Sequence, residues 1–438
     1  MAGRTTEKNM KRLMATVLVS GLVVALAAAA DWSQFLGPNR DNVSSETGLV
    51  KTFPKEGPKE LWKVDVGPGY GGPAIEGGMV YILDRVGEKG DNLRCLDLST
   101  GEQKWSYAYD APGKCPYPGS RSTPLVDKDY VFTIGVMGDM NCVSKTTHKP
   151  VWTKQLIKDF GGELPQWAVS QSPVAYKDTI IAAPLSKQAG VVAFSRDKGE
   201  VVWKTGALGA MKYPSPYVTT IDGVDQVIMV SDNGLVTGID AAKGDILWSY
   251  DKWVNKLVIS SPLNVGNGRI FICGGFNGDS IMLAVKKTDG KWSAELEFTN
   301  PKFTAGNANP VLYKGYLYSN GSTLRKFNGF QCMDLKGNLK WQTMSGTTMP
   351  SESQQAPVGY FGLGNIVLAG DVIFALNGDT GELAIIDPSP DGYKELARAK
   401  VLAAKDKTAW APLAISDGKL IVRDQHQMKC LDVKAAGK

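Results

Sequence analysis

Apolar and polar residues alternate along this chain in short runs, and Gly, Asp and Asn separate one run from the next. One run is YVFTIG (residues 130–135), and TPLVD (123–127) and VWTKQL (151–156) lie on either side of it. Alternation with a period of two predicts strands with one buried face, and the intervening residues predict tight turns. Long helical periodicity is absent from the sequence. We therefore predict an all-β protein.

The runs group into a repeating unit. A small or polar residue, a Pro and then an apolar strand recur eight times, 43 to 55 residues apart, at Pro73, Pro124, Pro173, Pro216, Pro262, Pro310, Pro357 and Pro412. In the seventh unit, IVLAGDVIFAL (366–376) fits the strand–turn–strand spacing better than the segment directly after Pro357. Eight units of four short strands predict an eight-bladed β-propeller of four-stranded antiparallel blades.

The two ends of the repeat fit together. The last unit stops at MKCLDVKAAGK (428–438), which is a third strand without a fourth. KELWKVDV (59–66) near the start is a fourth strand that lacks the three before it. We expect this N-terminal strand to complete the last blade and close the ring. A single propeller domain would then span residues 31–438.

Residues 1–30 have the character of a secretory signal. Lys8, Lys11 and Arg12 precede an apolar run from Leu13 to Ala30, with a plausible cleavage site at its small-residue end. An uncleaved membrane anchor is the alternative, and only then do we expect association with a membrane. Removal of these residues lowers the formal charge from +5 to +2. A nearly neutral surface gives no electrostatic case for nucleic acid or an anionic membrane. On the strength of the signal-like segment we expect a periplasmic or secreted protein.

One Trp recurs near the end of most units, and a Cys recurs on several third strands. We interpret the Trp residues as structural, packing between blades with the indole N–H satisfied locally: Trp62, Trp105, Trp152, Trp203, Trp248 and Trp341. Cys95, Cys142, Cys332 and Cys430 take near-equivalent buried places, too far apart to bridge. The default for all six Cys is a free thiol. Cys115, in a loop between blades, is the one most able to pair.

The strand phrase resembles that of the PQQ-like (pyrroloquinoline quinone repeat) β-propellers, whose blades carry an LDxxTGxxxW signature. LDLSTGEQKW (96–105) matches it fully, and IDAAKGDILW (239–248) matches with Lys243 in place of Thr. The opening stretch 32–63 is similar to secreted bacterial members of this superfamily. The resemblance implies the propeller, a WD40-like architecture. It also implies two kinds of function, the PQQ- and Ca²⁺-dependent alcohol dehydrogenases and cofactor-free scaffolds such as the propeller lipoprotein of outer-membrane assembly.

The residues expected of an enzyme are sparse. The resemblance directs attention to a vicinal Cys pair, Ca²⁺ ligands and a catalytic Asp, and no Cys-Cys pair exists in the sequence. DNGLVTGID (232–240) and FNGDS (276–280) could hold a hard cation, but their spacing is that of hairpin turns. His148 stands at a turn position, so we expect it to be solvated, and His426 has no evident Ser or Cys partner. We predict no catalytic residue, no metal and no cofactor of the protein's own.

Deviations from plain strand sequence mark the central funnel. The residues that we predict to bind a ligand there are Arg121, Trp167, Gln171, Asn307, Gln354 and Trp410, with Trp253, Lys256, Asn309 and Gln355 as further deviations. The alternative, which we favour, is that they satisfy backbone groups of the inner strands.

Our leading hypothesis is a monomeric binding or scaffolding module for a protein or polysaccharide partner, held on loop faces or blade edges. A PQQ- and Ca²⁺-dependent dehydrogenase that oxidises an alcohol or sugar is the alternative, and a hydrolase that uses funnel carboxylates is a third class.

Overall fold

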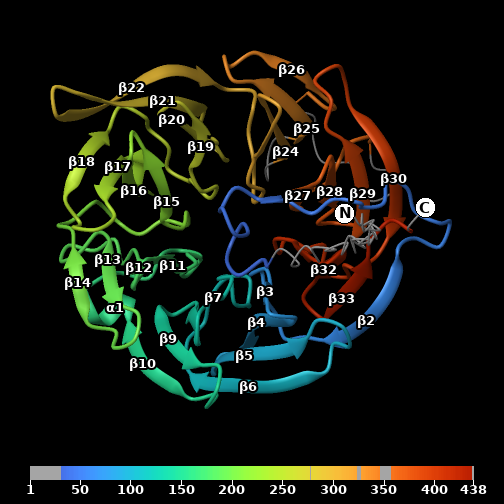
Figure 1. Ribbon diagram of the computed structural model, residues 1–438, viewed down its shortest axis with the longest axis horizontal. Helices are drawn as coiled ribbons and strands as arrows, with labels where there is room; N and C mark the ends of the chain where they lie inside the picture. The colour runs from blue at the N-terminus through green and yellow to red at the C-terminus, as the bar shows by residue number, and fades with distance from the viewer. Residues whose placement is uncertain (1–30, 277, 323–326, 346–356, 437–438) are drawn as a thin grey trace, which may run out of the picture.

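The computed structural model describes residues 31–276, 278–322, 327–345 and 357–436. The predicted signal segment, residues 1–30, lies outside the described residues. The described residues form eight sheets arranged as a ring around one axis (Figure 1), with only two short helices, α1 (Leu156–Asp159) and η1 (Asp232–Gly234). The predicted eight-bladed all-β propeller is confirmed.

Each of the first four blades is an antiparallel sheet of four strands. The first strand in sequence lies nearest the axis, and each later strand lies one place farther out. Blade 1 comprises β3 (Ala74–Glu76), β4 (Met79–Val86), β5 (Gly90–Asp97) and β6 (Gln103–Asp110). Blade 2 comprises β7 (Leu125–Asp127), β8 (Tyr130–Ile134), β9 (Asp139–Ser144) and β10 (Pro150–Gln155). Blade 3 comprises β11 (Val174–Tyr176), β12 (Thr179–Ala182), β13 (Val192–Ser195) and β14 (Val201–Lys204). Blade 4 comprises β15 (Tyr217–Ile221), β16 (Val224–Val230), β17 (Val236–Asp240) and β18 (Ile246–Tyr250).

The remaining blades follow the same plan, with additions at the last two. Blade 5 comprises β19 (Leu263–Gly266), β20 (Arg269–Ile272), β21 (Ser280–Thr288) and β22 (Lys291–Asn300). Blade 6 comprises β23 (Val311–Tyr313), β24 (Tyr316–Ser322), β25 (Phe327–Asp334) and β26 (Leu339–Gln342). Blade 7 comprises β27 (Ile366–Ala369), β28 (Val372–Leu376), β29 (Glu382–Asp387) and β30 (Lys394–Lys400), with β1 (Val43–Ser44) on its inner edge. Blade 8 comprises β31 (Ala414–Ser416), β32 (Lys419–Arg423), β33 (Gln427–Asp432) and the N-terminal β2 (Lys59–Asp65).

The Pro phrase marks the start of the inner strands. In blades 1 to 6 the inner strand begins directly after the Pro, because a residue without an N–H is tolerated where the ladder has not yet begun. In blade 8, β31 begins at Ala414, one residue later than this rule gives. Blade 7 departs most, since β27 begins at Ile366, nine residues beyond Pro357. The run 366–376 predicted for this unit therefore supplies β27 and β28.

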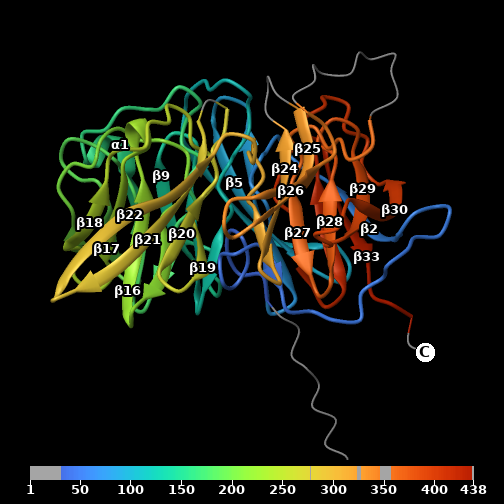
Figure 2. The same ribbon diagram turned by 90° about the horizontal axis from the view of Figure 1, so that it is seen from above.

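The ring closes between the first and last parts of the chain. β2 pairs antiparallel with β33, and Trp62 stands opposite Cys430. Figures 1 and 2 show β2 and β33 side by side at the rim of the ring. The predicted closure of the last blade by an N-terminal strand is confirmed.

A buried ion cluster reinforces this closure. Arg423 of blade 8 is fully buried, and its guanidinium lies 3.3 Å from Oδ1 of Asp84 in blade 1. Oδ2 of Asp84 contacts Arg94 at 3.2 Å, and Arg423 also donates to the carbonyl of Gly67 at 2.7 Å. Burial lowers the pKa of Arg423, and Asp84 opposes that shift. The cluster thus ties the last blade to the first, and each buried charge in it faces a group of opposite charge or a carbonyl.

The repeated Trp residues lie between blades. Their side chains are buried or half-buried, and four indole N–H groups donate to a backbone carbonyl of the following blade: Trp62 to Leu98, Trp152 to Arg196, Trp203 to Ala241 and Trp341 to Ser389. Trp248 donates to Gln226 within its own blade. Gly101, at φ 73°, shows how closely the Trp62 indole packs against the turn of the next blade. A Cβ at this position would lie 2.8 Å from the Trp62 ring. The small turn residue therefore makes room for the indole.

Blade 2 replaces that glycine with His148. The residue has φ 58°, in the same left-handed region, and its side chain is exposed as predicted. Its ring stacks on Trp105 of blade 1, with 4.8 Å between centroids and 13° between planes. An aromatic contact across the blade interface here takes the place of the close approach that glycine permits elsewhere.

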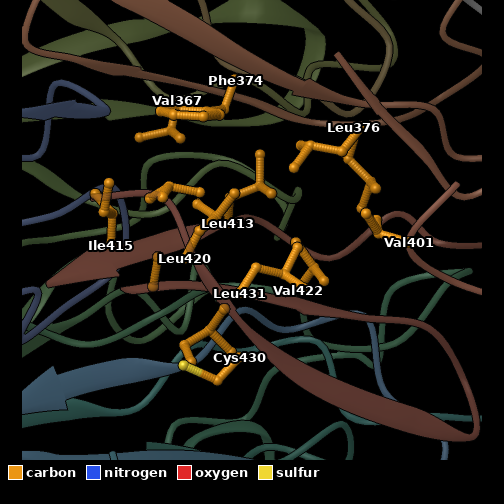
Figure 3. Close-up of a cluster of buried hydrophobic side chains, with 14 of the residues drawn as sticks. Val367, Phe374, Leu376, Val401, Leu413, Ile415, Leu420, Val422, Cys430 and Leu431 are labelled. Atoms are coloured by element: carbon orange, nitrogen blue, oxygen red, sulfur yellow. The ribbon is translucent and has the colours of Figure 1, made fainter. Parts of the chain in front are cut away.

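The cores lie between neighbouring sheets. Figure 3 shows the interface of blades 7 and 8, where Val367, Phe374 and Leu376 face Leu413, Ile415 and Leu420. Five of the six Cys are buried in such cores and all six are free thiols. Cys95, Cys142, Cys332 and Cys430 each stand opposite the repeated Trp of the outer strand. They serve as small apolar residues of the third strands.

Residues 31–44 cross the central channel and form what we call the N-terminal plug (Figure 1). Trp32 bridges to Ile75 of blade 1, and the carbonyl of Ser33 accepts the Val126 N–H of blade 2 at 2.8 Å. Arg40 donates to Val218 of blade 4, and β1 pairs in parallel with β27 of blade 7. A segment outside the repeat therefore joins four blades through the axis.

Candidate binding pocket on the propeller axis

Eight connections carry the chain from the outer strand of one blade to the inner strand of the next, on the same face of the ring as α1. Hydrogen bonds made by the residue just before the Pro link several of these connections. Thr123 N–H donates to Ser172 Oγ at 3.0 Å, and Ser172 N–H donates to Ser215 Oγ at 2.8 Å. Ser261 N–H likewise donates to Asn309 Oδ1 at 2.8 Å. The small polar residue before Pro thus satisfies the backbone of the neighbouring connection.

Within this ring of connections lies a pocket of about 190 Å³, which we call the mouth pocket. Every one of the eight connections contributes to its wall, and the plug and the β20–β21 loop add one residue each. The lining residues are Phe35, Tyr70, Tyr117, Arg121, Trp167, Ser170, Tyr213, Ser215, Ile259, Phe276, Asn307, Asn309, Leu363, Asn365, Trp410 and Pro412. The pocket is therefore on the axis and belongs to the whole ring rather than to one blade.

Aromatic rings form two parts of the wall, on successive connections around the ring. Tyr70 and Tyr117 each contact Trp410, with centroid separations of 5.5 and 5.6 Å. Trp167 and Tyr213 make a second pair, 5.5 Å apart and tilted by 41°. Such rings offer large apolar faces together with hydroxyl or indole N–H groups.

Arg121 is the one charged residue among the described residues of the wall, and its donors are largely used within its own loop. Its guanidinium donates to the carbonyls of Gly119 at 3.1 Å, Tyr117 at 2.9 Å and Pro116. The same group lies over the Tyr70 ring, 5.6 Å from its centroid. Arg121 therefore fixes the loop that carries Tyr117. Only the remaining N–H groups of its guanidinium are left to bind a ligand.

The polar groups of the wall divide into two kinds. Asn309 accepts the Ser261 N–H, and Asn365 donates to the Trp410 carbonyl at 2.6 Å. The side chains of Tyr117, Ser170 and Asn307 have no hydrogen-bond partner among the described residues, and all three are at least partly exposed. The first group builds the wall, and the second remains open to a ligand.

The floor of the pocket is the N-terminal plug. Phe35 lines the mouth pocket and also a small cavity below it, which is bounded by Leu36, Arg40 and Tyr217. A molecule entering from the mouth therefore meets side chains of the plug and cannot pass along the axis.

Apart from Arg121, the described residues of the wall are uncharged at neutral pH. Burial raises the pKa of Tyr70, with Arg121 opposing the shift, and burial also raises the pKa of Tyr213. Both phenols therefore stay protonated at neutral pH. None of the described lining residues is Asp or Glu. No group of three or more His, Cys, Asp or Glu in the described part of the chain is arranged to hold a metal ion.

Four of the six residues predicted to line the funnel meet in this pocket, namely Arg121, Trp167, Asn307 and Trp410. Gln171 does not, because it is fully buried and donates to the Lys212 carbonyl at 3.2 Å. Gln354 and Gln355 lie outside the described residues. Of the further deviations, Asn309 lines the pocket, Lys256 is exposed elsewhere and Trp253 is buried, donating to Asp279.

Sequence reasoning missed several wall residues, although a signal for them exists. In six units the residue three places before the Pro lines the pocket: Tyr70, Arg121, Ser170, Tyr213, Ile259 and Asn307. The regularity follows from the geometry, because each connection turns toward the axis at the same distance before its inner strand. Reading this one position across the repeat would have found Tyr70 and Tyr213. Phe35 carries no such signal, since the plug lies outside the repeat.

Solved structures with the same ring resemble the chain at low sequence identity. BamB from Moraxella catarrhalis aligns at 12% identity with a TM-score of 0.58, over 87% of this chain and 99% of that one. A europium-containing methanol dehydrogenase aligns at 12% identity and 0.62, over 90% and 89%. The quinohemoprotein alcohol dehydrogenase from Comamonas testosteroni aligns at 12% and 0.63, over 93% and 81%. No curated protein sequence matches the chain.

These likenesses show the fold alone, and the blade phrase together with a matching family model defines a PQQ-like β-propeller. The sequence pattern of one family, described as outer membrane protein assembly factor BamB, matches residues 46–135 and 136–391. The chain belongs to this family. In the described part of the chain, no helix is both long and apolar enough to cross a membrane.

Proposed function

We propose that the chain is an exported binding module that receives a protein or polysaccharide partner at the mouth of the propeller and carries no redox cofactor of its own. The observation that carries this proposal is the mouth pocket, because all eight connections contribute to it and its walls present aromatic faces and unpartnered polar groups. A concave, mostly apolar site with a few convergent polar groups is the usual form of a binding site. The signal-like residues 1–30 support export to the periplasm or beyond.

The size of the pocket favours anchoring over enclosure. About 190 Å³ is below the roughly 300–1,000 Å³ of sites that enclose a drug-sized ligand. One ring or one side chain of a larger partner fits this volume. Such a group, inserted while the rest of the partner spreads over the surrounding loops, is the usual form of an interface hot spot.

The description of the family also supports a protein partner. It names an assembly factor for outer-membrane proteins, which is a role carried out with other proteins. A partner of this chain would meet the mouth face, where Tyr117 is 48% exposed beside Trp410.

The alternative function is a PQQ- and Ca²⁺-dependent dehydrogenase, and the donor set of the mouth pocket does not fit it. The quinone bears three carboxylates, whereas Arg121 is the one cation among the described wall residues and its guanidinium is shared with three carbonyls of its own loop. A calcium ion prefers carboxylate oxygens, and the described wall has none. We therefore derive no redox step for this pocket.

The test is cosedimentation of the purified mature protein with two fractions of its host's envelope, the insoluble polysaccharide and the washed membrane proteins. We expect binding to one fraction, reduced about tenfold by Trp410→Ala combined with Tyr117→Ala, because aromatic anchors dominate such interfaces. Trp292→Ala on the outer hairpin of blade 5 is the matched control and should bind as the wild type does. Thermal unfolding of each variant verifies that the fold is retained.

Two results would overturn the proposal. One is equal binding by the double variant and the wild type, since the mouth would then play no part. The other is retention of PQQ with Ca²⁺ after desalting, together with oxidation of an alcohol or sugar coupled to a dye. The second result would establish the dehydrogenase instead.

A further inference from the structure

We infer that the mouth pocket recognises a single uncharged sugar ring at the end of a glycan chain. This inference rests on the proposed binding function and names the chemical class of the group that enters the pocket. Four features of the described wall residues carry it: their aromatic faces, their hydroxyl and amide groups without a partner among the described residues, the absence of a carboxylate among them, and the closed floor beneath them.

The aromatic faces suit the ligand's apolar surface. A pyranose ring has a face of C–H groups and a rim of hydroxyls, and its apolar face packs on the face of an indole or phenol ring. Trp410 with Tyr70 and Tyr117 supplies one such surface, and Trp167 with Tyr213 supplies another. Because both groups of rings belong to the connections, the ring of blades holds them in place.

The free polar groups distinguish a sugar from an apolar side chain. Tyr117 and Ser170 each offer a hydroxyl, and Asn307 offers an amide that both donates and accepts. None of the three side chains has a hydrogen-bond partner in the described residues. Filling the pocket with a purely apolar group would leave these atoms unpaired and would cost free energy, whereas sugar hydroxyls would pair with them.

The charge of the wall favours a neutral ligand. An amino sugar would find no carboxylate among the described lining residues. A uronic acid would find Arg121, but three of the hydrogen bonds of that guanidinium already go to the carbonyls of Pro116, Tyr117 and Gly119. Burying a carboxylate with so little compensation is unfavourable.

The closed floor selects the end of a chain. Phe35 of the N-terminal plug blocks the axis beneath the pocket, so a polymer cannot thread through. The volume of about 190 Å³ leaves space for one ring. The rest of the glycan must therefore extend outward over the mouth, where it makes fewer contacts.

The test titrates the mature protein with methyl glycosides of glucose, galactose, mannose, N-acetylglucosamine and glucuronic acid, observed by calorimetry and by tryptophan fluorescence. We expect at least one neutral glycoside to bind with a millimolar dissociation constant, and glucuronide to bind at least about fivefold more weakly. A tetrasaccharide of the preferred sugar should bind within about threefold of the monosaccharide, because only its terminal ring enters. Trp410→Ala should weaken binding about tenfold and Asn307→Ala about fivefold. Trp292→Ala should leave binding unchanged.

The inference is overturned if no neutral glycoside binds at millimolar concentration, if glucuronide binds as tightly as the neutral glycosides, or if Trp410→Ala has no effect on binding. When sugars fail but binding to the envelope still depends on Trp410 and Tyr117, the mouth binds another partner and only the sugar assignment is lost. When binding to the envelope is also independent of these residues, the binding function proposed for the pocket is lost as well.

Discussion

At the scale of single residues, the most consequential group is a carboxylate that joins the first and last blades. Asp84 is almost completely buried and lies between two guanidinium groups, those of Arg423 and Arg94. Arg423 has no exposed surface in its side chain, so it depends on Asp84 for charge compensation. Removing one member of such a cluster is more damaging than replacing the whole cluster with apolar residues.

We therefore expect Asp84→Ala to lower the free energy of unfolding by about 3–5 kcal/mol, because Arg423 is left charged and buried. Urea denaturation followed by circular dichroism measures the change. Asp371→Ala is the control, since Asp371 and its partner Lys51 are each 59% exposed. Asp371→Ala should lower the free energy of unfolding by less than about 1 kcal/mol. Equal losses in the two variants would show that the cluster adds nothing to stability.

The cysteines give a second prediction at this scale. Burial raises the pKa of Cys95 to about 11 and the pKa values of Cys142, Cys273, Cys332 and Cys430 to about 12. Because the thiolate is the reactive form, a disulfide reagent at pH 8 should modify Cys115 alone in the folded protein. All six should react after unfolding. Rapid modification of more than one thiol in the folded state would contradict the described cores.

The same shifts fix how stability depends on pH. The pKa values of the five buried thiols are higher in the folded protein than the roughly 8.5 of an unfolded cysteine. The folded state therefore holds these protons more tightly. Their contribution to stability is fully present below pH about 8.5 and is lost as the pH rises toward 11–12. Cys430→Ala should make the decline in alkaline solution shallower.

At the scale of elements, the repeat phrases reveal which strands exist and how each blade begins. The Pro before an inner strand and the Trp of an outer strand are readable because the same geometry recurs in successive blades. Residues 59–65 could be assigned to the last blade for a related reason, since an outer strand without a blade must complete a blade that lacks one.

Other features of the fold could not be predicted, because they depend on contacts that occur in one blade and are not repeated in the others. β1 pairs in parallel with the inner strand of blade 7 through two residues, too short a strand to leave a pattern in the sequence. Arg423 reads as an ordinary charged residue at the end of a strand, and its complete burial depends on Asp84, more than three hundred positions away. Gln171 looked suitable for the funnel because a polar residue there is unusual, but its side chain points to the backbone of the next connection.

The contact between β2 and blade 1 offers a test of how neighbouring blades are joined. Trp62→Ala should cost about 3–5 kcal/mol, because it removes a buried indole and its hydrogen bond to Leu98. Gly101→Ala in the wild type places a Cβ 2.8 Å from that indole. In the Trp62→Ala background only the strain of the positive φ remains. The alanine should therefore cost about 1–2 kcal/mol less there. Strictly additive losses would exclude a direct contact.

At the scale of the whole molecule, the ring is joined both at its rim and at its centre. The rim is closed by β2, and the Asp84 cluster joins the same two blades nearer the axis, between β4 and β32. The centre is crossed by the N-terminal plug, which bonds to blades 1, 2, 4 and 7. The two devices are separable, because β2 and the plug occupy different segments of the chain.

A chain that begins at Glu46 should therefore still fold into a closed ring, with lower stability. The N–H groups that lose a backbone carbonyl of residues 32–42 are those of Ile75, Val126 and Leu368. We expect these amides to exchange with deuterium at least about tenfold faster than in the full protein. The Val50 N–H, bonded to the Val433 carbonyl at 2.9 Å, is the internal control and should keep its protection. Uniform acceleration across all blades would mean that the plug is needed for folding itself.

The pairing of residues 59–65 with residues 427–432 also sets a condition on biosynthesis. The first of these segments leaves the ribosome hundreds of residues before the second, and until then it has no strand to lie against. Until the second segment has been made, both unpaired sheet edges of the nascent protein stay exposed, and this is when chaperones and proteases have the best access to it. A product terminated even a dozen codons early would keep seven intact blades and still be unable to leave that vulnerable stage.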